Sequence, residues 1–221
     1  MIARTSNALA PRAALAAREA EELALQPISD FPEAASGATA DAGQRIADWV
    51  RAYLMRPHTD LGRAGAVCPY TPIAARSGLV RIGASAARDE DAVFADMRRA
   101  VAAFEAMECT RAQRQFRSVI VGFPHCGGDE GRARLKRVQN RLRSESTRRG
   151  KMIGLFEPFS NDKGLLNPDF RPLRSPLPLL AIRSLVENNA PFVMRNPRLA
   201  PIYLLKFPVS GTRKLLSLLW R

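Results

Sequence analysis

The chain has 221 residues, and 46% of them are hydrophobic, which is enough for one domain to bury an ordinary core without disulfides. No apolar run approaches the roughly 20 residues that a membrane helix needs, so the sequence argues against a membrane-spanning protein. The net charge of +13 indicates an anionic partner and leaves open nucleic acid, anionic lipid, or an acidic substrate or protein.

Residues 1–43 are predicted to lie outside the core. They are rich in alanine, and from residue 26 onwards Pro, Gly and other small residues predominate, as in a linker. We therefore expect a disordered or weakly helical arm and linker over 1–43, and a single α/β domain over 44–208. Residues 209–221 combine leucines with Arg and Lys and predict an amphipathic tail. We favour docking on the body over an anionic membrane surface, because about ten residues make a weak anchor.

The body alternates helices and strands. Residues 44–55 place Ile46, Trp49 and Val50 on one helical face, with Asp41 as the expected N-cap. In chain order, the further predicted elements are a strand at 79–84, a helix at 89–107, a strand at 116–123, a basic helix at 130–149, strands at 151–157 and 177–186, and two short helical stretches within 187–208. Such alternation predicts an α/β or α+β fold, a two-layer sandwich with helices packed on a four- or five-stranded sheet.

The loop at 58–72 is rich in Gly and Pro and holds Cys68 close in sequence to Arg63. Pro69 follows the cysteine and supplies no N–H, so the backbone after the sulfur lacks one donor. A cysteine in such a loop is more often a small buried hydrophobe than a reactive group, and the residues alone favour that reading.

The basic helix is the densest concentration of charge. Residues 130–151 carry nine Lys or Arg against Glu130 and Glu145, a local net charge of 9 − 2 = +7. Residues 124–151 contain no aromatic side chain, whereas single-strand nucleic-acid binders interleave stacking rings with their charges. A solvated face, or a docking face for an acidic partner protein, is therefore favoured over nucleic acid.

A second rigid segment precedes the strand at 177–186. Four prolines lie between residues 168 and 178, and each fixes φ and disfavours helix at the residue before it. The segment therefore presents Arg171 and Arg174 at fixed places, and guanidinium groups bind carboxylates through two hydrogen bonds. Pairing with Asp169 or Glu157 of the same fold is an equally good explanation of these arginines.

The three cysteines, Cys68, Cys109 and Cys126, are odd in number and lack C-x-x-C spacing. This pattern argues against a disulfide framework and favours a reducing, cytoplasmic location. A zinc site drawn from these cysteines and His125 is disfavoured, because adjacent His and Cys ligands fit poorly around one ion.

Two blocks carry a resemblance to a known family. Residues 61–70 contain Gly-Ala-Val-Cys-Pro-Tyr, and residues 167–183 read Asn-Pro-Asp-Phe-Arg-Pro-Leu-Arg-Ser-Pro-Leu-Pro-Leu-Leu-Ala-Ile-Arg. Together they resemble the signature blocks of an uncharacterised bacterial domain-of-unknown-function family, often found beside specialised-metabolite biosynthesis genes. More distantly, the order of the blocks is similar to that of the haem-binding YcgG-like hydroxylases.

The distant resemblance implies haem. Cys68 would be the axial thiolate and metal ligand, and Arg171 and Arg174, with Arg63, would bind the cofactor's carboxylates. A thiolate-ligated haem favours O–O cleavage. The chain departs from the pattern at Phe156-Glu157-Pro158, where the hydroxylases are expected to have a histidine.

Two hypotheses of function follow. The first is a haem-thiolate oxygenase-type enzyme acting on a small, amino-acid-derived metabolite, with His125 or Glu157 handling protons. The second is a non-enzymatic interaction protein whose basic helix at 130–149 docks an acidic partner or nucleic acid. An enzyme without haem also remains open. The first hypothesis requires the two proline-rich loops to frame one pocket.

Overall fold

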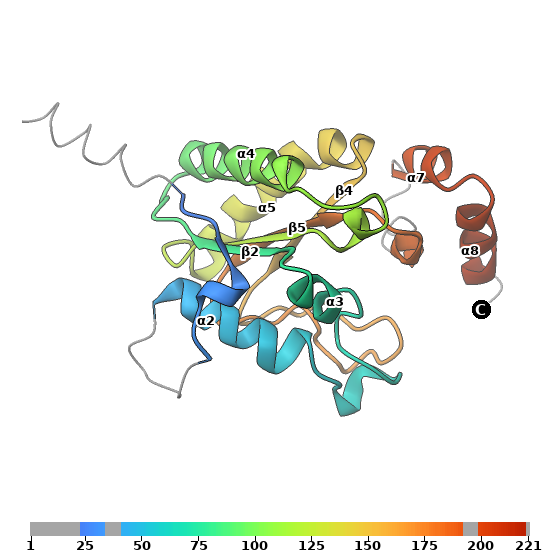
Figure 1. Ribbon diagram of the computed structural model, residues 1–221, viewed down its shortest axis with the longest axis horizontal. Helices are drawn as coiled ribbons and strands as arrows, with labels where there is room; N and C mark the ends of the chain where they lie inside the picture. Colours follow the sequence, from blue (N-terminus) through green and yellow to red (C-terminus); the bar gives the residue numbers. More distant parts are fainter. Residues whose placement is uncertain (1–22, 34–40, 192–198, 220–221) are drawn as a thin grey trace, which may run out of the picture.

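The protein forms a mixed α/β fold around one open sheet. The computed structural model describes residues 23–33, 41–191 and 199–219. The five strands lie in the order β1-β2-β3-β5-β4 (Figure 1). They are β1 (Gln26–Pro27), β2 (Val80–Ala84), β3 (Ser118–Gly122), β4 (Lys151–Phe156) and β5 (Leu179–Ser184). β2 and β3 run parallel, and every other neighbouring pair is antiparallel. The prediction of a mixed fold on a four- or five-stranded sheet is confirmed.

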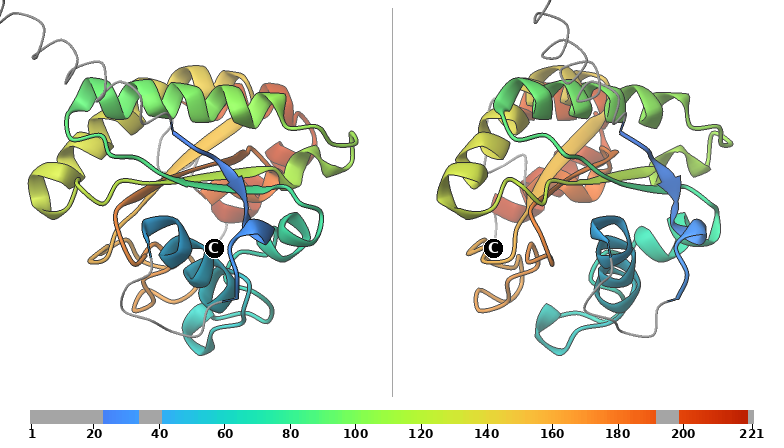
Figure 2. Two further views of the ribbon diagram at one scale, coloured as in Figure 1. Left: turned by 60° about the vertical axis from the view of Figure 1, so that its left-hand side comes forward. Right: turned by 90° about the vertical axis from the view of Figure 1, so that its left-hand side faces the viewer.

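One face of the sheet is covered by α4 (Glu90–Ala106) and α5 (Gly128–Arg148), which form the upper layer in Figure 2. In β3, Val119 and Val121 point into this layer, because alternate residues of a strand face opposite sides. Leu180 and Ile182 of β5 do the same. Fully burying each such side chain contributes about 1.5–3 kcal/mol, so this layer holds the main apolar core.

The opposite face carries a second helical layer in addition to the two layers expected. It consists of α2 (Ala42–Trp49), one π-helical turn η2 (Val50–Leu54) and α3 (Thr71–Arg76). Ile46 packs there against Ile82 and Ile120. The contacts of α2 and α3 with the sheet are concentrated on β2 and β3. The same face of β5 and β4 is therefore left for loops and a cavity.

Helix boundaries follow local chemistry. The Asp41 side chain accepts a hydrogen bond from the Gln44 backbone N–H (2.7 Å), and Asp89 accepts one from the Ala92 N–H (2.9 Å). These caps satisfy N–H groups that have no partner within the helix. After α5, Gly150 has φ +71°, a left-handed conformation that L side chains rarely adopt. The chain can therefore turn directly from α5 into β4.

The segments flanking the body also have defined structure. Residues 26–27, expected in the linker, form β1 and pair with β2 at the sheet edge. Residues 28–30 of the expected linker form the short helix η1 (Ile28–Asp30), and Ile28 is buried in the core, whereas residues 1–22 and 34–40 of the expected arm and linker lie outside the described residues. The tail expected over 209–221 contains α8 (Ser210–Leu219), which lies beside α7 (Ala200–Lys206) in Figure 1.

The tail helix contacts the body through polar and apolar groups. The Ser210 hydroxyl donates to Glu187 (2.7 Å) of the short helix η5 (Glu187–Asn189), and Tyr203 is buried among α7, α8 and the body. No helix in the described part of the chain combines the length and the apolar character needed to cross a bilayer.

Candidate functional site

A cavity of about 780 Å³ lies on the face of β5 and β4 that α2 and α3 leave free. Its apolar wall is formed by side chains from α2, η2 and the sheet: Trp49, Leu54, Ile120, Met152 and Phe156. The cavity continues around the edge strand β4 to α5, and part of the loop at 157–178 lines it as well. It is therefore a groove along the sheet edge with both apolar and charged walls.

Arg183 is the charged side chain that the sheet places in this cavity. Its neighbour Ile182 points into the α4/α5 core, so Arg183 points to the opposite face, between Ser118 of β3 and Met152 of β4. Its guanidinium group forms no hydrogen bond or ion pair with any described residue. Burial lowers the pKa of Arg183, and the nearby Cys68 and Tyr70 partly offset that effect. The protein thus holds a half-buried cation that opens on the cavity, without an acidic partner among the described residues.

Cys68 lines the same cavity, close enough to Arg183 for electrostatic interaction. Its backbone N–H donates to the carbonyl of Leu54 (3.0 Å), which fixes the loop against η2. The side chain is half-buried and packs partly against the apolar cluster below the sheet. It therefore combines a packing role with an opening to the cavity. Thr71 and Ser118 add hydroxyl groups to the same wall.

Glu157 also lines this cavity, at the end of β4. Its carboxylate pairs with Arg132 of α5 (2.8 Å), and its side chain is only 13% exposed. The Glu157 backbone N–H donates to Leu173 (3.2 Å), and its carbonyl accepts from Ser175 (3.3 Å). The proline-rich loop therefore positions Glu157.

Arg171 and Arg174 line a different cavity, of about 510 Å³, together with Tyr53 and His58. The Arg171 guanidinium donates to backbone carbonyls of its own loop, and Arg174 Nε donates to the Ser160 carbonyl (3.3 Å). Burial raises the pKa of Tyr53 to about 12, although nearby Arg174 opposes the shift. Trp49 lines both cavities, so they are neighbours, but the two arginines do not share a cavity with Cys68.

Arg63 and His125 are among the lining residues of neither cavity. The Arg63 guanidinium donates to the carbonyls of Ala64 (2.9 Å), Ala66 (3.0 Å) and Val67 (3.1 Å), so it braces its own loop. His125 is exposed after β3, with Nε2 3.4 Å from an Arg88 nitrogen. Their cofactor and proton-transfer roles stay predictions.

The structure divides the expected site. Cys68 and Glu157 line one cavity, Arg171 and Arg174 line the neighbouring one, and Arg63 and His125 line neither. Arg183, which the sequence analysis did not single out, lines the cavity of Cys68. Arg183 ends the second signature block, and a cation inside an otherwise apolar strand was the signal that could have identified it. In the described part of the chain, no group of three or more His, Cys, Asp or Glu side chains is arranged to hold a metal ion.

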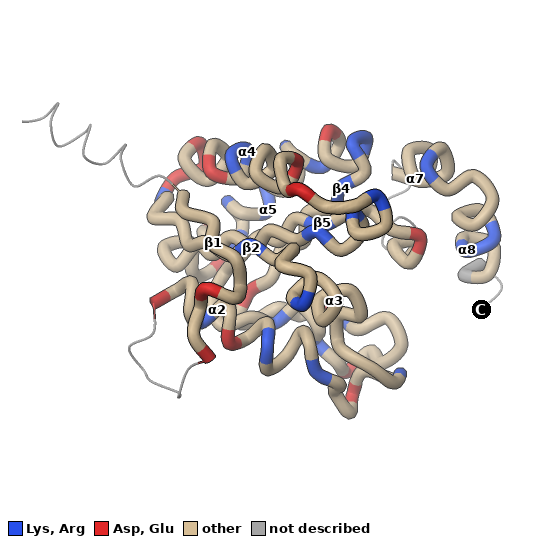
Figure 3. The backbone as a smooth tube through the Cα atoms, in the orientation of Figure 1, with Lys and Arg blue, Asp and Glu red and all other residues tan. Residues whose placement is uncertain are grey.

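The basic helix is largely neutralised within the fold. Acidic residues of α4 lie beside α5 on one side of the sheet (Figure 3). Of the nine Lys and Arg residues at 130–151, six form ion pairs with acidic side chains: Arg132, Arg134, Arg137, Arg141, Arg149 and Lys151. The uncompensated positive charge of residues 130–151 is therefore much smaller than the local net charge of +7 that the sequence gives.

Comparisons with known proteins support a family assignment and no finer one. No curated protein and no solved structure gives a significant match, so the similarity to the YcgG-like hydroxylases stays a prediction. A family model described as a domain of unknown function, DUF6875, matches residues 43–216, a range that includes residues 61–70 and 167–183. The chain therefore belongs to the DUF6875 family, in agreement with the expected membership of an uncharacterised domain family.

Proposed function

We propose that the protein binds a small organic acid in the cavity over β5 and β4, with Arg183 as its counter-charge and Cys68 as the reactive group beside it. The observation that carries this proposal is the guanidinium of Arg183, which faces the cavity without an acidic or hydrogen-bonding partner among the described residues. A small metabolite derived from an amino acid is an acid of this kind.

The energetic argument concerns the cost of an unpaired, half-buried charge. Removing an ion from water costs several kcal/mol even after the protein relaxes, unless an opposite charge and hydrogen bonds compensate. A carboxylate accepts two parallel hydrogen bonds from a guanidinium group and supplies the missing counter-charge. The aromatic wall of Trp49 and Phe156 then suits an apolar or aromatic body on the ligand.

Binding is tested with a simple carboxylate and its neutral analogue. Benzoate should raise the melting temperature of the protein, whereas benzamide, which lacks the charge, should not. Arg183→Met should abolish the benzoate effect, and Arg183→Lys should retain part of it. Equal protection by benzoate and benzamide, or undiminished benzoate protection in Arg183→Met, would contradict the proposal.

The role of Cys68 has an internal control. Cys68 and Cys109 are both half-buried, but only Cys68 is among the residues that line the cavity. Benzoate should therefore slow alkylation of Cys68 by iodoacetamide and leave Cys109 unaffected, as measured by peptide mass spectrometry. Equal protection of both thiols, or of neither, would remove Cys68 from the site.

A haem-thiolate oxygenase is the second candidate. Its support is that the Cys68 thiol opens on a cavity of about 780 Å³ with apolar walls. Against it, the expected carboxylate-binding residues Arg171 and Arg174 line the neighbouring cavity, and Arg63 is engaged by its own loop. The expected set of haem-binding residues therefore has no common cavity, and we derive no reaction step through haem. Haem titration should give a Soret band that Cys68→Ala shifts; absence of binding would end this candidate.

The interaction-protein alternative receives less support, because most of the basic helix is already paired within the fold. Docking of an acidic partner through residues 130–149 stays a prediction, as does the cytoplasmic location. If the protein binds no polyanion at physiological salt, the docking hypothesis is refuted.

A further inference from the structure

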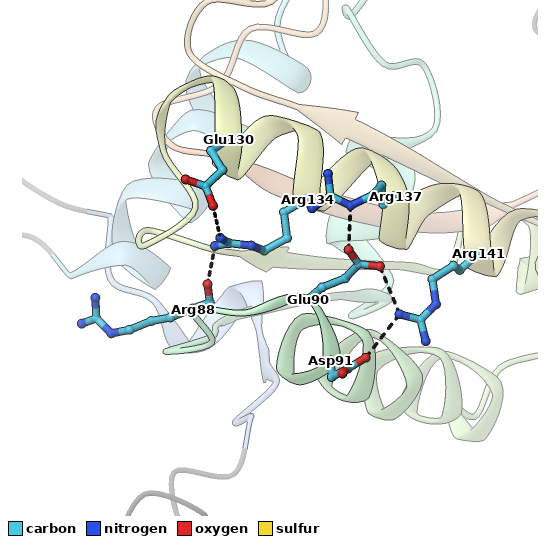
Figure 4. Close-up of polar contacts among 7 residues, drawn as sticks. All are labelled: Arg88, Glu90, Asp91, Glu130, Arg134, Arg137 and Arg141. Carbon is cyan, nitrogen blue, oxygen red and sulfur yellow. Dashed lines mark hydrogen bonds and ion pairs between the residues drawn. The ribbon is translucent and has the colours of Figure 1, made fainter.

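The charges of α5 divide between two faces of the helix. On the side of α4, Arg137 pairs with Glu90 (2.6 Å), and Arg141 pairs with Glu90 (3.2 Å) and Asp91 (3.4 Å), as Figure 4 shows. Arg134 of this side pairs with Glu130 (3.0 Å) of its own helix. Arg137 and Arg141 therefore link α5 to α4, and all three arginines have counter-charges within the protein.

The other charged face of α5 lines the cavity. Arg132, Lys136 and Arg143 are four and seven residues apart, which places them along one side of the helix, and all three line the groove beside β4. Arg132 has the Glu157 carboxylate as a partner (2.8 Å). Lys136 and Arg143 form no hydrogen bond or ion pair with any described residue. The counter-charge on this face is therefore incomplete.

The charges around Lys136 show that positive charge exceeds negative charge on this face of α5. The Lys136 side chain is exposed at the edge of the groove and Arg143 is half-buried; partial desolvation, followed by the neighbouring charge of Arg143, lowers the pKa of Lys136. Arg132 acts in the same direction, whereas Asp162 and Glu157 oppose it. The like charges on this face repel each other, and a bound anion would reduce that repulsion.

We propose that Lys136 and Arg143, with Arg132 at the edge, form a second anion subsite that binds a phosphate group, so that the ligand of the cavity is a phosphorylated organic acid. This inference rests on the proposed function, because it assigns a second charged group to the same ligand. A phosphate fits better than a second carboxylate, because its two negative charges and several oxygens match two or three clustered cations. Asp129 and Asp162 also line the groove, and their negative charges offset part of the positive charge around Lys136 and Arg143.

Inorganic phosphate is the probe, compared with chloride at matched ionic strength. Phosphate should raise the melting temperature of the wild-type protein and of Arg148→Met. Arg148 is an ideal control, because it lies on the same helix, is exposed, has no ion pair among the described residues and is not among the lining residues. The double variant Lys136→Met/Arg143→Met should bind phosphate at least about tenfold more weakly, since it loses charge-assisted hydrogen bonds.

Further arms make the result decisive. Lys136→Arg, which keeps the charge, should retain phosphate binding, and circular dichroism checks that the double variant is folded. Phenyl phosphate should bind more tightly than inorganic phosphate if a phosphate ester is the ligand, and equal affinity would overturn the ester assignment. No phosphate protection beyond chloride, or equal protection in the double variant and Arg148→Met, would overturn the subsite.

The proposed carboxylate site at Arg183 and the proposed phosphate subsite at Lys136 and Arg143 can be refuted independently. Benzoate protection depends on Arg183, whereas phosphate protection depends on Lys136 and Arg143 and should persist in Arg183→Met. Benzoate binding without phosphate binding would overturn the subsite and leave the proposed function standing. Phosphate binding without benzoate binding would support the subsite and overturn the role of Arg183.

Discussion

Replacing Arg183 by methionine should make the ligand-free protein more stable. Methionine keeps an unbranched apolar side chain for the cavity wall and removes the half-buried charge. In the described part of the chain, no acidic side chain would be left behind without its partner, which is what makes most arginine substitutions costly. Arg183 is thus expected to be a site where binding function opposes stability.

The magnitude follows from the environment of the side chain. A fully buried ion costs several kcal/mol, but Arg183 is partly open to the cavity, so we take a gain of about 1–2 kcal/mol on substitution. For a chain of this size, each kcal/mol shifts the melting temperature by roughly 2–4 °C, which gives a rise of about 2–8 °C. Thermal unfolding followed by circular dichroism, in buffer without organic acids or phosphate, measures it.

The control is another partly buried arginine on the sheet. Arg81 of β2 donates to the Gly78 carbonyl (2.7 Å), so Arg81→Met loses a hydrogen bond and should lower the melting temperature slightly. A fall in melting temperature for Arg183→Met similar to that of Arg81→Met would refute the reasoning, because it would show that the protein itself satisfies the Arg183 guanidinium.

Three further predictions concern the rest of the fold. Gly150→Ala should destabilise the protein by about 1–2 kcal/mol in urea unfolding, because φ is +71°, a conformation that is strained for an L side chain, whereas the tip of Lys206 can move away from the new Cβ; no change in the urea midpoint would contradict the turn geometry. The hydrogen bond from buried Lys151 holds the pKa of Glu105 below its usual 4.5. The Glu105–Lys151 pair therefore stabilises the fold fully above pH 4.5, and this stabilisation is lost as the pH falls through the folded-state pKa of Glu105. Glu105→Gln should therefore flatten the fall in unfolding free energy below pH 4.5, and an unchanged acid profile would count against the pair. Arg63→Met should cost about 1 kcal/mol through lost loop hydrogen bonds and leave benzoate binding intact; lost binding would instead place Arg63 in the site.

Local features of the fold were predictable from the sequence, because their causes are local. Asp41 and Asp89 cap helices that begin where the apolar periodicity begins. The alternating burial around Val119 and Val121 follows from the two-residue repeat of a strand. The short strand β1 was missed, because two residues carry no periodicity and pair only when β2 is already present.

The sequence by itself determined which elements form, which residues are apolar, and that two proline-rich loops flank a sheet. Only the tertiary structure decided which charges meet. The register of β5 places Arg183, rather than Arg171 and Arg174, beside Cys68, and the position of α2 and α3 over β2 and β3 leaves that cavity free. The packing of α4 against α5 likewise decides which arginines are neutralised. These outcomes depend on contacts between residues far apart in the chain, and no local pattern specifies such contacts.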